Sequence, residues 1–368
     1  MQTKELIAVR DLAFLEFKSG ENGSHGVTLV NPLEGQRFAL RSAPILEVLT
    51  AAVRPAERAE LAARLAERLE LEPAQAEALV DGLVERGVLE RVAEGAEDNW
   101  LEMWHHYNWE VASLYHFLSR GIRFADVDRA ERPPMDVRED VIEEYRRGEP
   151  FPYRDVSSAG EEDAVVLPRG EAEVDWPLGP TLLKRKTLRT WAWRRLSQQE
   201  LGNLLWYGLR PIGENRAVVA ADPGFSRVEP LLTHFAHLGV WVLPIRVDGI
   251  ENAIYRYDPV GHRLLPRGTY PDARSLEALC VGQVPLRDAS VVVVLSGMFE
   301  EFMWRYRHNR AYRVLWLEVG QMMQNLHLTA TGMRLRPFLT PALRDSQLDE
   351  LLGLDGYREG ALYLSAFG

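Results

Sequence analysis

Cysteine and lysine are scarce in this chain of 368 residues. The one cysteine, Cys280, excludes an intramolecular disulfide, and no group of cysteines and histidines has the spacing of a zinc site. We therefore expect no metal centre and a reducing, cytoplasmic setting. Arginine supplies nearly all of the positive charge, because lysine occurs only at Lys4, Lys18, Lys184 and Lys186.

Long apolar runs are absent as well. The longest, Ala289–Leu295, is far too short to cross a membrane, and the N-terminal residues MQTKELIAVRD lack the apolar core of a signal peptide. A net charge of −11 disfavours binding to nucleic-acid phosphates. Hydrophobic residues make up 46% of the chain, as in ordinary globular proteins. Neither a membrane nor a nucleic acid is therefore an expected partner.

Residues 1–95 have the pattern of a small winged-helix-like unit, in which short strands precede helices and a last strand follows Gly87. The expected elements are strands at Leu12–Phe17, Gly26–Val30 and Arg37–Leu40, a helix capped by Ser42, helices at Pro55–Leu71 and Pro73–Arg86, and a strand at Val88–Val92. The last helix carries acidic residues, which argues against the DNA binding that such a unit often serves.

Residues 96–175 are predicted to connect two domains. Trp100–Arg120 has an aromatic-rich helical pattern that favours packing between domains. Glu131–Asp175 is rich in proline, glycine and charge, which indicates a connecting arm with one short helix at Glu139–Arg147.

Residues 176–368 mix strands and helices. Ser197 and Glu200 form a capping box that opens a helix to Leu209, and the glycines and prolines of Arg210–Pro230 predict a loop. The remaining expected elements are strands at Val240–Val247, Ile254–Asp258, Ser290–Leu295 and Ala361–Ala366, and a short helix at Leu348–Leu352.

The most informative stretch is Phe302–Met333. Its apolar residues recur at helical spacing and predict one buried face: Tyr312, Leu315, Trp316, Val319, Met322, Met323, Leu326, Ala330 and Met333. Glu318, Gln321 and Gln324 are predicted to follow the opposite, polar edge. The helix is preceded by a corner of cations and aromatics between Arg305 and Arg313. The plain alternative is a core helix beside a solvated arginine patch.

A second cluster of cations lies at Lys184–Trp191, with the sequence KRKTLRTW. Arginine, lysine and threonine side chains donate hydrogen bonds to phosphate oxygens, so this cluster is a candidate phosphate clamp in an otherwise acidic protein. The alternative is a solvated charged surface.

Four segments together resemble the SagB-type (thiazoline/oxazoline) dehydrogenases of the nitroreductase superfamily, over roughly Pro180–Gly368. The segments are RKTLRTW with LSQQELGNLLW, AIYRYDP, FMWRYRHNRAYRVLWLEVGQMMQNLHLTATGM and LRDSQLDELLGLDGYREGALYLSAFG. Residues 1–95 resemble the PqqD-like precursor-recognition unit, which captures a leader peptide at an exposed strand edge and its third helix. A structural wing without a ligand is the alternative for that unit.

The resemblance implies an α+β fold with a central sheet flanked by helices, which binds FMN in a homodimer. It places three cations and a hydroxyl on the family's phosphate motif, and further contacts along the long helix and on a loop at Arg336–Thr340. The implied cofactor contacts are Arg185, Lys186, Thr187, Arg189, Arg313, Gln324, Asn325, Phe338 and Leu339.

Two positions depart from the family pattern. Arg305 and Tyr306 fall on the family's catalytic Lys-Tyr pair, and arginine cannot act as a base. Tyr306 is then the expected acid/base with Arg305 beside it, unless Tyr306 is only an aromatic residue packed at a subunit interface. The family's Pro-Ser-x-Gly loop aligns with Pro230–Phe235, where Thr233 or His234 are candidates for a substitute hydrogen bond to the flavin.

The leading functional hypothesis is an FMN-dependent peptide dehydrogenase that converts an azoline to an azole, or carries out a related backbone oxidation, with oxygen reoxidising the flavin. Its expected partners are a ribosomally made precursor peptide and a cyclodehydratase or other modifying enzyme. A nitroreductase-like enzyme that uses NAD(P)H is the first alternative. A catalytically impaired scaffold subunit of a peptide-modifying complex is the second.

Overall fold

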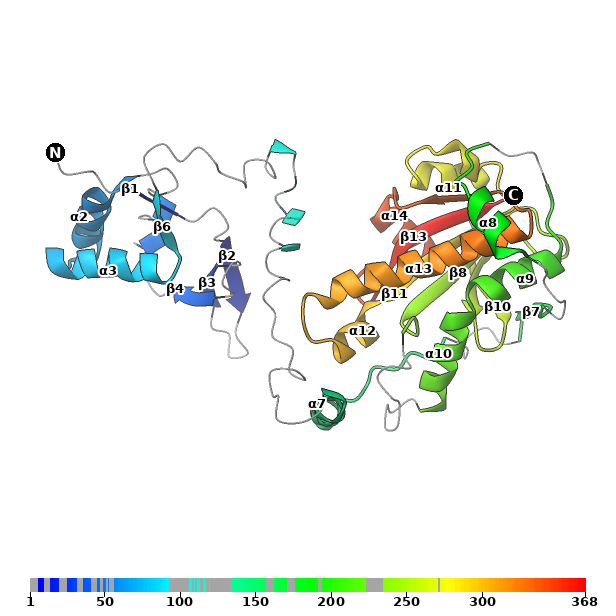
Figure 1. Cartoon of the computed structure of the whole chain (residues 1–368), viewed down its shortest axis with the longest axis horizontal. Helices are drawn as coiled ribbons and strands as arrows, with labels where there is room; N and C mark the ends of the chain where they lie inside the picture. The colour runs from blue at the N-terminus through cyan, green and yellow to red at the C-terminus, as the bar shows by residue number, and fades with distance from the viewer. Residues whose placement is uncertain are drawn as a thin grey trace. The chain divides into compact units, whose positions relative to one another are not determined.

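The chain forms two compact units, Met1–Arg123 and Phe124–Gly368, in a computed structural model (Figure 1). The structure describes residues 6–9, 14–19, 25–31, 36–40, 45–46, 49–50, 52, 56–92, 106–107, 109, 111–112, 115–116, 119, 134–156, 162–170, 176–190, 194–222, 234–270 and 272–368.

The N-terminal unit combines two small antiparallel sheets with helices. One sheet has the strand order β2-β3-β4 and the other β5-β1-β6. Its elements are β1 (Leu6–Val9), β2 (Phe14–Ser19), β3 (His25–Asn31), β4 (Gln36–Leu40), β5 (Ala56–Glu57), α2 (Arg58–Leu69), α3 (Pro73–Glu85) and β6 (Leu89–Val92). The three predicted strands before Ser42, the two later helices and the closing strand are present, whereas β1 and β5 were not predicted. Most of the helix predicted after Ser42 lies outside the described residues.

Local sequence explains how α3 begins and ends. Pro73 occupies the first turn, and Glu72 and Gln75 form a reciprocal capping box. Gly87 follows the helix with a φ of 66°, a conformation that glycine adopts without strain, and lets the chain return as β6. Buried leucine and valine side chains of α2 and α3, including Leu61, Leu65 and Val80, form the core of this unit.

The C-terminal unit is built on a seven-stranded antiparallel sheet with the order β12-β13-β11-β8-β9-β10-β7. Its strands are β7 (Val165–Val166), β8 (Leu238–Pro244), β9 (Ile254–Asp258), β10 (Arg263–Gly268), β11 (Val291–Met298), β12 (Pro337–Thr340) and β13 (Glu359–Phe367). Its helices are α7 (Pro134–Gly148), α8 (Leu178–Lys184), α9 (Gln198–Gly208), α10 (Arg210–Ala221), α11 (Ala273–Leu279), η2 (Val284–Leu286), α12 (Phe299–Arg305), α13 (Ala311–Gly332) and α14 (Asp345–Leu352).

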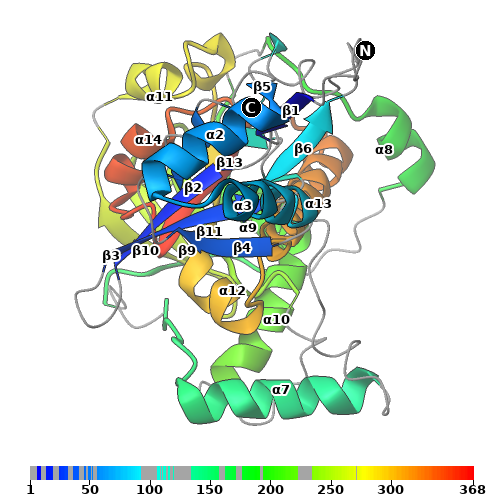
Figure 2. The ribbon, with the colours of Figure 1, turned by 90° about the vertical axis from the view of Figure 1, so that its left-hand side faces the viewer.

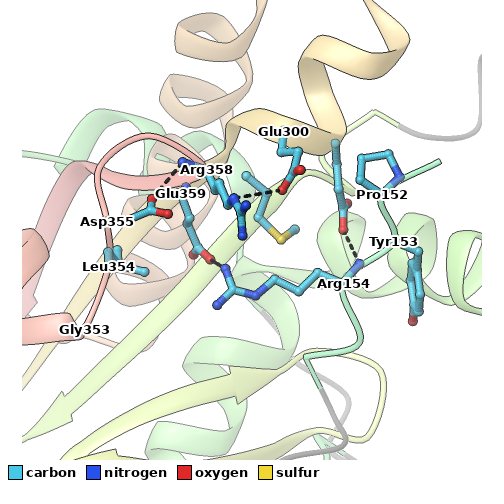
Figure 3. Close-up of a pocket in the computed structure, with 11 residues that line it drawn as sticks. Pro152, Tyr153, Arg154, Glu300, Gly353, Leu354, Asp355, Arg358 and Glu359 are labelled. Atoms are coloured by element: carbon cyan, nitrogen blue, oxygen red, sulfur yellow. Dashed lines mark hydrogen bonds and ion pairs between the residues drawn. The ribbon is translucent and has the colours of Figure 1, made fainter. Parts of the chain in front are cut away.

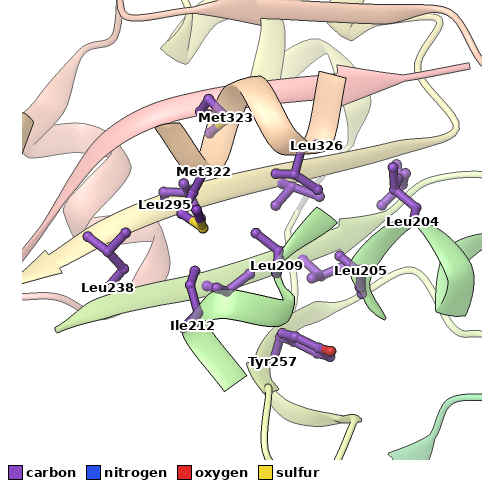
Figure 4. Close-up of a cluster of buried hydrophobic side chains, with 14 of the residues drawn as sticks. Leu204, Leu205, Leu209, Ile212, Leu238, Tyr257, Leu295, Met322, Met323 and Leu326 are labelled. Carbon is purple, nitrogen blue, oxygen red and sulfur yellow. The ribbon is translucent and has the colours of Figure 1, made fainter. Parts of the chain in front are cut away.

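Helices cover both faces of this sheet. In β11, Val291, Val293 and Leu295 pack in a core with α9 and α13, whereas Val292 and Val294 pack in a second core with α11 and α14. Figure 4 shows the first core, where α13 lies over β8 and β11. Burial on both faces explains why β11 is continuously apolar rather than alternating.

Two segments that were expected to be loops form regular structure. The prediction of a loop across Arg210–Pro230 was wrong for its first half, because α10 occupies Arg210–Ala221. Pro211 lies in the first turn, where a proline needs no hydrogen-bonded N–H. The loop expected at Arg336–Thr340 is largely strand β12, which pairs with β13.

The arm expected before the second domain contributes to that unit. α7 is longer than the predicted short helix, and β7 pairs with β10 at the edge of the sheet. Ile142 of α7 packs with Val219 of α10 and Trp304 of α12. Figure 2 shows α7 next to α10.

The contact between α9 and α13 depends on a glycine. A Cβ at Gly208 would lie 2.7 Å from the Leu326 side chain and 3.1 Å from its Cα. We expect Gly208→Ala to lower the free energy of unfolding by about 1–3 kcal/mol through overpacking. Gly320→Ala, at an exposed helical position with open space around it, should instead raise it by about 0.5–1 kcal/mol. Urea denaturation of both variants tests this, and equal effects would contradict it.

Candidate active site

The predicted catalytic pair lies where α12 ends. Arg305 is the last residue of the helix and is buried, and Tyr306 follows it and is half-buried. The Arg305 guanidinium carbon lies 4.8 Å from the centroid of the Tyr306 ring, a cation–π distance. The ring of Phe302 lies 4.9 Å from that of Tyr306 and supports it from one helical turn earlier.

A turn with His234 as its first described residue packs beside this pair. The ring of His237 lies 5.7 Å from Phe302, which also contacts Tyr306. Glu318 of α13 accepts hydrogen bonds from the Phe235 backbone N–H and the His234 ring. The structure therefore brings His234 to the end of α13 that carries the pair, while Thr233 lies outside the described residues.

The predicted phosphate clamp lies near the other end of α13. Arg185 caps α8, and the Leu188 N–H donates to the Pro337 carbonyl of β12 at 2.9 Å. Burial and the Arg185 charge lower the pKa of His327, in the last third of α13, to about 4. Lys186 and Arg189 are exposed and Thr187 is half-buried.

The clamp carries uncompensated positive charge. Within the described part of the chain, none of Arg185, Lys186 and Arg189 lies within ion-pair distance of a carboxylate. In a protein of net charge −11, three cations without acidic partners beside a threonine hydroxyl fit a phosphate group. The residues present thus suit the phosphate of a nucleotide cofactor.

The remaining candidates also divide between the two ends of α13. Gln324 is exposed and Asn325 half-buried on the clamp side, whereas Arg313 is half-buried in the first turn. Phe338 is buried in the core, so its side chain is turned away from solvent, and Leu339 is half-buried. From Ala311 to His327 the helix rises about 24 Å.

Two buried carboxylates, Glu301 of α12 and Glu359 of β13, form hydrogen-bond networks next to the pair. Neither was predicted from the sequence. Glu301 of α12 accepts two hydrogen bonds from the buried Arg216 guanidinium, at 2.6 and 3.1 Å, and one from His237 at 3.2 Å. Although burial alone would raise the pKa of Glu301, the His237 hydrogen bond and the Arg216 charge lower it to about 2. Burial lowers the pKa of His237, so its imidazole is neutral.

The second carboxylate is Glu359, at the start of β13. It pairs with the buried Arg256, accepts hydrogen bonds from Ser296 and Trp241, and receives the Arg154 guanidinium at 2.8 Å. Glu359 and the Arg154 side chain border a pocket of about 480 Å³ (Figure 3). The backbone N–H of Arg154 donates to Glu301 at 2.8 Å, so this residue joins the two carboxylates.

Glu318 is buried, so its predicted place on the exposed edge of the long helix was wrong. We predicted that it lies on the polar edge of the long helix, but it is only 4% exposed. Tyr312 and Trp316, predicted on the buried face, are 44% and 38% exposed. The inward face of α13 is thus rotated toward Glu318, which helical periodicity alone did not reveal.

The C-terminal unit matches a known family over part of its length. Residues 233–368 match the Nitroreductase family, so the C-terminal unit carries a nitroreductase-family domain. The expected α+β fold, a central sheet flanked by helices, is confirmed.

Among individual proteins, the chain is 26% identical to the trifolitoxin operon protein TfxC of Rhizobium leguminosarum bv. trifolii, over 91% of this chain and 94% of that protein. Among solved structures it is similar to the E. coli microcin synthetase McbBCD complex with truncated pro-MccB17 bound, with 21% identity, a TM-score of 0.40, and coverage of 68% of this chain and 98% of that one. Nitroreductase A of Vibrio parahaemolyticus shares 16% identity at a TM-score of 0.34, over 52% of this chain and 66% of that one.

The described residues contain neither a membrane-spanning helix nor a metal-binding group. No helix among them is long and apolar enough to span a membrane, and no group of three His, Cys, Asp or Glu side chains in them could hold a metal ion.

The Glu301 network predicts acid sensitivity. Because the pKa of Glu301 is lowered from 4.5 to about 2 on folding, its contribution to stability is complete above pH 4.5 and is lost as the pH falls toward 2. The shift corresponds to about 3 kcal/mol. Denaturant midpoints measured across this range should fall steeply for the wild type and less steeply for Glu301→Gln. Glu214→Gln, at an exposed ion pair, should keep the wild-type slope. An unchanged slope in Glu301→Gln would refute the assignment.

Proposed function

We propose that this protein is an FMN-dependent dehydrogenase that oxidises a ribosomally synthesised peptide, from azoline to azole or by a related backbone dehydrogenation. The observation that carries the cofactor assignment is the clamp of three cations without acidic partners among the described residues, in a chain with a nitroreductase-family domain. Similarity to the trifolitoxin operon protein TfxC over 91% of the chain supports the assignment of a peptide as the substrate.

The chain's own residues have distinct roles in this proposal. Arg185, Lys186, Thr187 and Arg189 hold the cofactor phosphate by charge-assisted hydrogen bonds. Gln324, Asn325, Leu339, Thr233 and His234 would contact the flavin ring. When bound, the flavin supplies a hydride acceptor, and oxygen is the final electron acceptor.

At the substrate, Tyr306 and Arg305 complete the site. The guanidinium cannot release its proton, but its position against the Tyr306 ring stabilises a phenolate or binds a substrate carbonyl. The Tyr306 side chain is half-buried and accessible to a substrate, whereas the Arg305 side chain is buried. Tyr306 therefore transfers protons, and Arg305 orients and polarises.

The working enzyme is a homodimer in which each site uses both copies. The pair precedes Ala311 and the clamp lies near His327, two residues about 24 Å apart along α13, and this separation favours a second copy that joins them. Large apolar side chains are exposed on α8 and α13, including Leu183 at 85% and Leu317 at 66%, and these two helices are in contact. Such a surface suits burial against a second copy.

The N-terminal unit binds the leader peptide, and the core peptide then reaches the active site. The partner enzyme is a cyclodehydratase or another modifying enzyme. In the sheet β2-β3-β4, strands β2 and β4 form the two edges among the described strands, and an extended peptide adds to such an edge by main-chain hydrogen bonds. Tethering in this way raises the effective concentration of a weakly bound core peptide.

The family match itself favours a second candidate, a reductase that passes electrons from NAD(P)H to a small oxidant. Consumption of NAD(P)H at a rate that no peptide alters would support that candidate. A protein that cannot be loaded with FMN would support a scaffold role.

The clamp assignment predicts loss of cofactor. Arg185→Ala with Arg189→Ala should weaken FMN binding by about 100-fold or more, because each charge-assisted hydrogen bond contributes about 1.5–3 kcal/mol. Fluorescence titration with FMN measures this. Arg64→Ala with Arg68→Ala removes the same charge from α2 and should leave the affinity unchanged. Equal loss in both double variants would show a general charge effect instead of a clamp.

The shared site predicts complementation. A clamp variant, Arg185→Ala with Arg189→Ala, and Tyr306→Phe should each be inactive alone. Mixed after dissociation, they should recover about a quarter of wild-type peptide oxidation, since half of the dimers are mixed and each holds one intact site. Absence of recovery in dimers shown to be mixed would place the clamp and Tyr306 in the same copy.

A further inference from the structure

The buried carboxylates of the C-terminal unit differ in how they are neutralised. Three of them have an arginine partner, while Glu318 has only a histidine among the described residues. The pairs are Asp258 with Arg263, Glu301 with Arg216, Glu359 with Arg256, and Glu318 with His234. A permanently charged partner suits a structural ion pair, whereas a histidine completes the pair only when it gains a proton.

The contact geometry gives each Glu318 oxygen one partner. Oε1 lies 3.2 Å from His234 Nδ1, and Oε2 accepts the Phe235 backbone N–H at 3.1 Å. Phe235 has a φ of 66°, an unfavourable conformation for a bulky residue that the second hydrogen bond helps to hold. The Glu318 side chain is 6% exposed and that of His234 is 47% exposed, so the carboxylate is fixed and the imidazole reaches solvent.

This arrangement selects one form of the imidazole. A carboxylate accepts only, so neutral His234 donates from Nδ1 and leaves Nε2 as an unprotonated acceptor. When Nε2 takes a proton, the buried Glu318 charge stabilises the resulting cation. The same logic applies wherever a carboxylate orients a catalytic histidine.

His234 also lies at the catalytic end of α13. Phe302 contacts both the ring of His237, three residues further along the turn, and the ring of Tyr306. Arg305 in this region cannot accept a proton. His234 is therefore a reachable side chain of this neighbourhood with a free nitrogen lone pair.

We propose that His234, rather than Tyr306, is the general base that takes the proton from carbon and that Glu318 is its positioning residue, an inference that rests on the proposed dehydrogenase function. Tyr306 then keeps a hydrogen-bonding role toward the substrate. In an azoline, His234 Nε2 takes the proton from the ring carbon that was the residue's α-carbon. The electron pair of that C–H bond forms the ring double bond, as the neighbouring carbon releases a hydride to the oxidised flavin. The substrate thus loses two electrons and two hydrogens, and the flavin is reduced.

A single substitution separates this role from a structural one. In Glu318→Gln the amide oxygen can still accept the Phe235 N–H, but the NH₂ group then faces His234 Nδ1. That nitrogen becomes an acceptor, and the proton moves to Nε2, so the base is disabled while the turn is kept. In His234→Gln the base is removed altogether.

The first measurement is made without flavin. Long-range ¹H–¹⁵N NMR of the flavin-free full-length protein, with His234 assigned by comparison with His234→Gln, should show protonated Nδ1 in the wild type and protonated Nε2 in Glu318→Gln. A wild-type ring protonated at Nε2 would overturn the proposal.

The second measurement uses a synthetic peptide that carries one thiazoline and the FMN-loaded proteins. At saturating FMN, we expect kcat to fall about 100-fold or more in His234→Gln and about 10-fold or more in Glu318→Gln, with KM for the peptide unchanged. A wild-type kcat in His234→Gln would overturn the proposal. Failure of the proposed function has a different signature, because the wild type itself would then leave the thiazoline unoxidised with FMN bound.

Discussion

The catalytic end of the domain depends on the hydrogen bonds and ion pair of the buried Glu301 carboxylate. This carboxylate is the meeting point of α12, Arg216 of α10, His237 of the turn before β8, and the Arg154 backbone. Removing any one partner would leave a charge or a hydrogen-bonding group buried without compensation, at a cost of several kcal/mol. Because α12 ends in Arg305, this network sets the position of the pair that the sequence singles out.

The charge distribution along α13 separates two tasks. At one end, acids and bases are buried and paired, which gives a polar but electrically balanced surrounding for Tyr306 and His234. Near the other end, three cations have no acidic partner among the residues that the structure describes, which suits an anion from outside the protein. A helix of 22 residues is long enough to keep these environments apart, and the core under it holds both in place.

Local signals in the sequence predicted the elements that local physics decides. Helical periodicity located α13, the capping box of Ser197 and Glu200 located the start of α9, and a continuous apolar run located β11. The signals failed where tertiary contacts decide. Arg216 and Glu301 are 85 positions apart, and Arg256 and Glu359 are 103 apart, so no local pattern connects them. Glu318 is buried because the turn that contains His234 and Phe235 packs on it. That turn is distant from α13 in the sequence, so the helical pattern does not reveal the burial.

The two departures from the pattern of SagB-type dehydrogenases become connected once the fold is known. One replaces a lysine, which can act as a base, by Arg305, and the other replaces a loop of small residues by one that contains His234. They are 71 positions apart in sequence, yet Phe302 and His237 link them in space. If the lysine position lost its basic function, the bulkier loop provides a new proton acceptor at the same end of α13. The buried Glu318 is what makes the histidine more than a space-filling substitution, because its carboxylate lies 3.2 Å from Nδ1 and holds the ring in one orientation.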